Sequence, residues 1–182
     1  MNRSRFLTLG LGLAIVTVLA ACSEPTALVV DEEVQPEFYF GGGKKDRDHG
    51  DSPLICPTHT TRSATGIIRP NGGTVKLDGH SVTFPAGAVT KPTEVTIRTP
   101  ASRYLIVNLR ADGQEYPTFR KPVTVTISYD RCKGRIDPSD LVAYQIDPNT
   151  GELIEQMPSS VNPVRKTVTF KTSHFSHFVI AD

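Results

Sequence analysis

Apolar and polar residues alternate along most of the chain after residue 64. The stretch 123–129 is the clearest case, because valine, isoleucine and tyrosine at its odd positions alternate with threonine and serine at its even positions. A strand with one buried face and one face in water has this pattern. The same period predicts strands at 74–77, 81–84, 94–99, 104–109, 123–129, 141–146, 152–156, 167–171 and 175–181.

Turn residues separate these predicted strands. Glycine permits positive φ and proline fixes φ, and such residues occur at 71–73, 78–79, 85–87 and 147–151. No helix longer than a turn or two is indicated, and there is no internal repeat. Many short strands at this spacing predict an all-β fold, a two-sheet antiparallel β-sandwich.

The first 52 residues do not share the period-two pattern. Arg3 and Arg5 precede an apolar run at 6–19, and small residues lead from that run to Cys22, which is the layout of a secretory signal. The run falls short of the roughly 20 residues that span a bilayer and has no basic flank after it, so a retained membrane span is the weaker hypothesis. We predict a signal peptide at 1–21, Cys22 with a linker at 22–52, and a folded domain at 53–182.

The residues Leu19-Ala20-Ala21-Cys22 resemble the bacterial lipobox. The resemblance implies that the Cys22 thiol receives diacylglycerol before the signal is cut on its amino side, and that acyl groups then hold the chain to a membrane. Two or more acyl chains give stable anchoring. Ser23, in place of aspartate, resembles the outer-membrane sorting signal of enteric bacteria and favours the outer over the inner membrane. The alternative is a soluble secreted protein with a chance cysteine.

The segment 23–52 is acidic and has no sustained period, with eight acidic and three basic side chains and a run of glycine at 41–43. It is predicted to be a disordered tether with a reach of roughly 30 Å. Residues 34–40, which include three consecutive aromatics, are the one piece that could dock on another surface. Asp46, Asp48 and Asp51 do not form an EF-hand loop, because its twelfth position falls at Pro57.

Cys56 and Cys132 are candidates for a disulfide in an oxidising compartment. Closing a loop of that size would stabilise the fold by roughly 4 kcal/mol at most. The alternatives are two free thiols, or a metal site formed by Cys56 with His59. Two nearby ligands without a second pair are weak evidence for zinc, so no metal or other cofactor is predicted.

Net charge argues against a nucleic-acid partner. The formal net charge is +1, and it becomes −1 without Arg3 and Arg5. Arg131, Lys133 and Arg135 surround Cys132 without interleaved aromatics, which indicates a solvated loop. Asp137, Asp140 and Asp147 fall in predicted turns, where aspartate is ordinary. The chain has no phosphate-binding glycine loop, zincin motif or serine nucleophile elbow.

Several segments, in order, resemble the ZU-five domain of zona occludens proteins, uncoordinated-five proteins and ankyrins. The matching residues are 72–75, 82–89, 93–98, 121–127 and 173–178, which together lie within residues 72–178. The resemblance implies a β-sandwich that acts as an interaction or structural module, without a cofactor, on secreted or surface proteins.

The tripeptide His174-Phe175-Ser176 also occurs where some ZU-five domains and nucleoporins cleave themselves. That likeness implies attack of the Ser176 hydroxyl on the Phe175 carbonyl, with His174 assisting proton transfer and water completing the hydrolysis. The competing interpretation is that Phe175 and Phe178 pack in the core while the polar neighbours bind backbone or solvent. His174 and His177 are poor metal partners, because three steps along an extended strand point to opposite faces.

Three functional hypotheses follow. The first is a non-enzymatic lipoprotein of the cell envelope, whose sandwich binds a protein or an envelope polymer through loops or a sheet edge. The second is a self-processing domain that cleaves between Phe175 and Ser176. The third is a carbohydrate- or peptide-binding surface domain, which a sandwich supports without a sequence signature.

Overall fold

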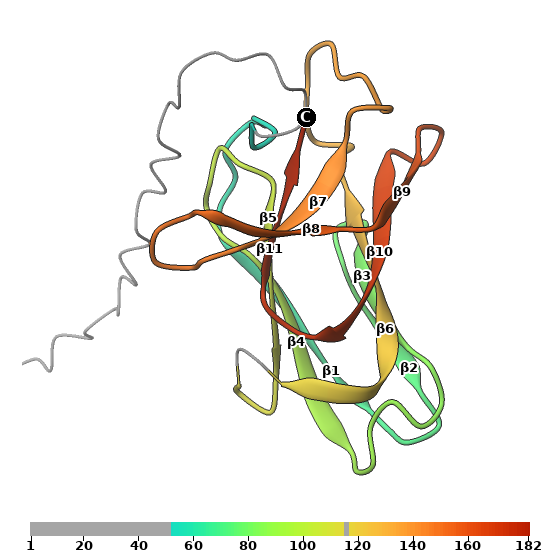
Figure 1. Ribbon diagram of the computed structural model, residues 1–182. Coiled ribbons are helices and arrows are strands. Elements are labelled where there is room, and N and C mark those ends of the chain that lie inside the picture. Colours follow the sequence, from blue (N-terminus) through green and yellow to red (C-terminus); the bar gives the residue numbers. More distant parts are fainter. Residues whose placement is uncertain (1–51, 115–116) are drawn as a thin grey trace, which may run out of the picture. The chain divides into compact units, whose positions relative to one another are not determined.

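The computed structural model describes residues 52–114 and 117–182, and every regular element in this part is a β-strand (Figure 1). Because these residues form no helix, none of them provides an apolar helix long enough to cross a membrane. The strands are β1 Arg62–Ile68, β2 Gly73–Leu77, β3 His80–Phe84, β4 Thr93–Thr99, β5 Ile106–Ala111, β6 Thr118–Ser128, β7 Val142–Ile146, β8 Leu153–Met157, β9 Ser159–Asn162, β10 Thr167–His174 and β11 His177–Ala181.

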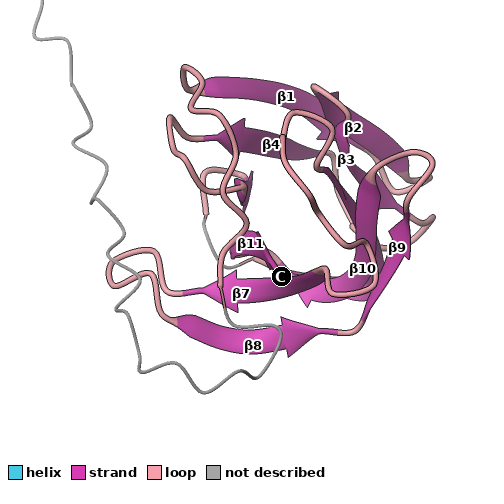
Figure 2. Ribbon diagram, turned by 90° about the horizontal axis from the view of Figure 1, so that it is seen from above, coloured by secondary structure: helices cyan, strands magenta, loops and turns pink. Residues whose placement is uncertain are grey.

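The strands form two antiparallel sheets. A six-stranded sheet has the order β1-β4-β5-β11-β7-β8, and a five-stranded sheet has the order β2-β3-β6-β10-β9. The chain passes from one sheet to the other six times, namely between β1 and β2, β3 and β4, β5 and β6, β6 and β7, β8 and β9, and β10 and β11. Figure 2 shows β8 leading into β9, which lies beside β10. The predicted all-β, two-sheet antiparallel sandwich is confirmed.

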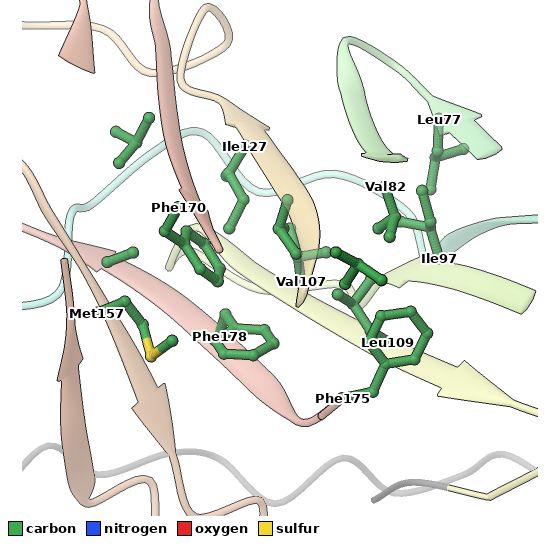
Figure 3. Packing of buried hydrophobic residues seen from close by; sticks show 14 of the residues in the cluster. Leu77, Val82, Ile97, Val107, Leu109, Ile127, Met157, Phe170, Phe175 and Phe178 are labelled. Carbon is green, nitrogen blue, oxygen red and sulfur yellow. The ribbon is translucent and has the colours of Figure 1, made fainter. Parts of the chain in front are cut away.

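The hydrophobic core lies between the inner faces of the two sheets (Figure 3). In β6, Val123, Val125 and Ile127 are buried and the threonines between them are half-exposed, as the alternation predicted. Phe170 of β10 and Phe178 of β11 face each other from opposite sheets, with ring centroids 4.9 Å apart. The two aromatics therefore join the layers at the centre of the core.

Two turns show why glycine is needed in this fold. The β2–β3 hairpin turns at Asp78 (φ 47°) and Gly79 (φ 85°), the pair of positive φ values that a two-residue type I′ turn requires. Gly72 has φ 88°, and a Cβ atom there would lie 2.5 Å from the carbonyl oxygen of Phe84. Any larger residue at Gly72 would collide with the backbone at the end of β3.

The predicted strand at 175–181 is partly wrong. The structure ends β10 at His174 and begins β11 at His177, so Phe175 and Ser176 form a corner between the two sheets. β1 and β9 were not predicted, because β1 carries mostly exposed side chains and β9 has only four residues. The predicted signal peptide, Cys22 and tether lie outside the described residues, and the domain boundary at 53 stays a prediction.

Candidate functional site

Cys56 and Cys132 form a disulfide, which confirms the predicted pair. Both residues are buried, and 76 positions of sequence separate them. Because its sulfur is bonded to Cys132, Cys56 cannot serve as a thiolate ligand beside His59, so the alternative zinc site is wrong. In residues 52–114 and 117–182, no three His, Cys, Asp or Glu side chains are grouped to hold a metal ion.

The segment before Cys56 extends the six-stranded sheet at the end of β11. The Asp182 amide donates to the Ser52 carbonyl at 3.0 Å, and the Leu54 amide donates to the Ile180 carbonyl at 2.7 Å. The Leu54 carbonyl in turn accepts from the Leu105 amide at 3.2 Å. The disulfide therefore links an extension of this sheet to the loop that follows β6 of the other sheet.

Arg131 holds this end of the sandwich together from within. Its Nη1 donates to the Pro57 carbonyl at 2.5 Å and its Nη2 donates to the Tyr104 carbonyl at 3.1 Å. Partial burial lowers the pKa of the guanidinium. The prediction of a solvated loop is therefore wrong for Arg131, which is half-buried on backbone carbonyls, and is confirmed for Lys133 and Arg135, which are exposed.

An open polar cleft of about 580 Å³ lies beside Arg131. His80 is its most buried titratable residue, and the Ser128 amide donates to its Nδ1 at 3.2 Å. An acceptor at Nδ1 places the proton of the neutral ring on Nε2. Burial, and then the nearby Arg131 charge, lower the pKa of His80 to about 4. The cleft lining is His59, Thr60, Arg62, Asp78, Gly79, His80, Thr99, Ser128, Asp130 and Arg131.

Ion pairs occupy the two carboxylates of this cleft. Arg62 lies 2.9 Å from Asp78, and Lys166 lies 2.8 Å from Asp130. The lining has hydroxyl, imidazole and guanidinium groups but no Phe, Tyr or Trp ring. The cleft can offer hydrogen bonds to a small polar group, and it lacks the aromatic platform on which a sugar ring would stack.

Sequence reasoning missed the cleft because its residues come from four separate stretches. The lining residues fall within 59–62, 78–80, 128–131 and at Thr99, and each stretch is an ordinary turn or strand end when taken alone. The one available signal was the Asp78-Gly79-His80 turn. There a histidine stands at the first position of a strand, on the same side as the buried residues Val82 and Phe84.

The His174-Phe175-Ser176 corner is held by hydrogen bonds on both sides. The Phe175 amide donates to the Pro117 carbonyl at 3.1 Å, and the Leu109 amide donates to the Ser176 carbonyl at 3.1 Å. The Phe175 ring packs edge-on against Phe84 and Phe119, with centroids 5.8 and 4.7 Å away. The interpretation that Phe175 and Phe178 pack in the core is confirmed, because both are fully buried.

The side chains of the corner are arranged only partly as self-cleavage requires. Ser176 is fully buried, and its Oγ has no hydrogen-bond partner among the described residues. His174 Nε2 lies 3.0 Å from Gln145 Oε1 on the neighbouring sheet. A buried hydroxyl could attack the preceding carbonyl, but hydrolysis of the resulting ester would need water to enter a packed corner.

The premise that His174 and His177 share one strand is wrong. His174 ends β10 in the five-stranded sheet, and His177 begins β11 in the six-stranded sheet. Their separation follows from the corner between the sheets and not from the alternation of a single strand.

The remaining aspartates are turn residues, as predicted. Asp137 accepts from the side-chain hydroxyl and the backbone amide of Ser139, and both bonds lower its pKa. Asp147 accepts from the amides of Asn149 and Thr150, which lowers its pKa in the same way. These carboxylates complete local turns.

Comparison with known proteins adds no family to this picture. No protein-family model matches the chain, and no curated protein sequence matches it. The resemblances to the lipobox and to the ZU-five domain stay predictions that depend on the residues quoted for them.

Proposed function

We propose that this protein is an exported lipoprotein, anchored through acyl groups on Cys22, that presents its β-sandwich as a non-enzymatic interaction module of the cell envelope, with the outer membrane favoured. The observation that carries the proposal is the Cys56–Cys132 disulfide. Buried disulfides of this kind form and persist in oxidising compartments outside the cytoplasm. The disulfide therefore supports the export that the apolar run and Cys22 predict.

The polar cleft is the surface best suited to recognition. It joins both sheets near the disulfide, and its groups offer hydrogen bonds in directions set by buried neighbours. No nucleophile in it is paired with a base, so binding is favoured over turnover. The absence of aromatic rings in its lining weighs against a carbohydrate ligand and leaves a peptide or another polar group as its occupant.

The anchoring is tested by growth with an alkyne analogue of palmitate followed by membrane fractionation. The natural chain is expected to carry the label and to sediment with membranes, whereas Cys22→Ala is expected to carry none and to lose its signal-dependent processing. Ser23→Asp is the matched control, because it keeps acylation and should shift the protein toward the inner membrane. Identical labelling and retention of Cys22→Ala would rule the anchor out.

The recognition surface is tested by a photo-reactive amino acid at Thr60 on the cleft rim, with Lys171 on the five-stranded sheet as the matched position. Both side chains are exposed. Cross-linking on intact cells is expected to capture an envelope component at position 60 and not at 171, and an excess of purified unlabelled protein should compete for it. Equal capture at both positions would reject the cleft as the binding surface.

The second candidate function is self-cleavage between Phe175 and Ser176. One observation favours it, namely that the Ser176 hydroxyl at the corner has no hydrogen-bond partner among the described residues. A nucleophile that is not engaged elsewhere is free to turn toward the adjacent carbonyl. The bond between His174 and Gln145 opposes it, because it engages the imidazole that would assist.

Intact mass of the purified protein distinguishes the two candidates. Self-cleavage predicts a species lacking Ser176–Asp182, which Ser176→Ala would abolish while Gln145→Ala would leave or increase it. A single species ending at Asp182 after prolonged incubation, in the natural chain as in Ser176→Ala, would exclude self-cleavage.

A further inference from the structure

The strand register shows which residues lie on the outer face of the six-stranded sheet. His177 of β11 lies between Asn108 of β5 and Ile146 of β7. Two residues further along β11, Val179 lies between Ile106 and Tyr144. Their sequence neighbours Phe178 and Ile180 belong to the core between the sheets, so these rows face the opposite way, away from the core.

This outward face is apolar at its centre and closed to water. Ile106, Ile146 and Val179 form a hydrophobic cluster separate from the main core, and each is at most 1% exposed. The outer face of a two-layer sandwich ordinarily carries polar residues. Tyr104, Tyr144 and Leu153 pack around the cluster but are only partly buried themselves. We call the three aliphatic residues the outer patch.

Polar groups beside the outer patch also indicate a covering segment. Asn108 is 6% exposed, and its Oδ1 has no hydrogen-bond partner among the described residues. A buried acceptor of this kind costs free energy until a donor reaches it. Arg98 and Arg110 lie on the same face. Arg98 of β4 is opposite Asn108 of β5 in the strand register, and Arg110 follows Asn108 by two residues on β5. The face therefore combines an apolar centre, a buried acceptor and two cations on one side.

The chain that enters the domain can reach this face. Ser52 lies at the end of β11, where its carbonyl accepts a hydrogen bond from the Asp182 amide. From Ala181 to His177 is four steps along β11, or about 13 Å at the rise of a strand. Residues 41–51 could span roughly 35 Å if fully extended. The glycines at 41–43 permit the chain to reverse direction there.

The residues before those glycines have the matching chemistry. Gln35–Phe40 combines one carboxylate, Glu37, with the aromatic residues Phe38, Tyr39 and Phe40. In an extended segment Glu37 and Tyr39 point to the same side, two residues apart. The amides of such a segment are donors that the Asn108 oxygen lacks.

We propose that residues Gln35–Phe40 dock across the outer face of the six-stranded sheet, with Tyr39 on the outer patch and Glu37 toward Arg98 and Arg110. The docked segment excludes water from the patch and supplies a backbone donor to Asn108. If Cys22 is acylated as proposed above, only residues 23–34 remain as spacer, with a reach of roughly 20 Å in place of 30 Å.

The experiment places a photo-reactive phenylalanine analogue at position 39 of the mature chain in detergent. A cross-link within one chain to peptides of β5, β7 or β11 is expected. Arg98→Glu with Arg110→Glu should lower its yield at least fivefold, and Glu37→Arg should restore yield in that variant. Lys76→Glu, an exposed change on the five-stranded sheet, is the control and should leave the yield unchanged.

Four outcomes would overturn the proposal. They are no cross-link, a link to the five-stranded sheet, a link to detergent or lipid alone, and a link between labelled and unlabelled copies in a mixture. Hydrogen exchange shows whether the Arg98→Glu, Arg110→Glu variant is still folded. In that variant the amides of β6 and β10 should stay protected, while the amides of residues 37–40 should lose protection at least tenfold. The test does not need Cys22, so its failure would leave the anchoring proposal intact.

Discussion

The outer faces of the two sheets are built in opposite ways. On the five-stranded sheet, threonine hydroxyls pair across strands, with Thr74 3.0 Å from Thr83 and Thr126 3.1 Å from Thr169, and these residues are exposed or half-exposed. On the six-stranded sheet, β11 is buried at all five positions. The first face satisfies its polar groups by itself and with water, whereas the second needs another layer.

The contrast shows that the pattern of apolar and polar residues along a strand depends on what covers each of its two faces. The regular alternation in β6 indicates one face in water, and the continuous burial of β11 indicates cover on both. In a two-layer sandwich the second cover has to come from outside the two sheets. Substitutions on each outer face should therefore have very different effects on stability.

The largest effect is expected from a charge placed on each outer face. Val179→Asp buries a carboxylate in the outer patch and should lower the free energy of unfolding by about 4 kcal/mol. Thr83→Asp, at an exposed position of the other face, should cost less than about 1 kcal/mol. Urea denaturation of both variants measures the difference, and equal costs would show that the outer patch is open to water.

A slightly smaller effect is expected from the bond that joins the two sheets. The double variant Cys56→Ser with Cys132→Ser should lose about 3 kcal/mol, because the unfolded chain regains the freedom of a long loop. Reduction of the natural protein with dithiothreitol under denaturing conditions should produce the same midpoint shift. If both treatments left the midpoint unchanged, the link between the sheet extension and the β6 loop would contribute nothing.

The buried histidine of the cleft should make stability depend on pH. His80 has a folded-state pKa of about 4, below its unfolded value near 6.5, so the unfolded chain binds the proton more tightly. Stability from the neutral ring is complete above pH 6.5 and is lost as the pH falls toward 4, by up to about 3 kcal/mol. Unfolding curves from pH 4.5 to 7.5 should show the loss.

The matched variant for that titration is His80→Asn. Asparagine keeps an acceptor for the Ser128 amide near the position of Nδ1 but does not titrate. Its pH slope below 6.5 should be flatter than that of the natural chain, while the two slopes coincide above pH 6.5. Parallel slopes throughout would show that protonation of His80 does not oppose folding.

The regular parts of the fold were predictable from sequence because their pattern is local. The alternation in 123–129 and the Asp78-Gly79 turn depend only on near neighbours, and both are confirmed. The disulfide was also predictable, because Cys56 and Cys132 are the two cysteines that remain once Cys22 is assigned to the predicted lipobox. In each of these features, the residue types themselves are enough to explain the local structure.

The corner at Phe175 and Ser176 was not predictable in the same way. Residues 175–181 contain no glycine, proline, asparagine or aspartate, so none of these turn residues marks where the chain leaves one sheet for the other. The corner depends on distant partners, namely the Pro117 carbonyl and the rings of Phe84 and Phe119. The cleft was missed for a related reason, because Thr99, His80 and Arg131 meet only after both sheets have formed.

The smallest effect is expected on the face that carries paired hydroxyls. Thr126 and Thr169 share a 3.1 Å hydrogen bond, and a double-mutant cycle with Thr126→Val and Thr169→Val should give a coupling of about 0.5 kcal/mol or less. Water replaces the lost partner on an open face, so neither single change leaves a hydroxyl unsatisfied. A coupling well above about 1 kcal/mol would mean that water does not reach these hydroxyls. The five-stranded sheet would then be covered as well, and the contrast between the two outer faces would no longer identify where Gln35–Phe40 docks.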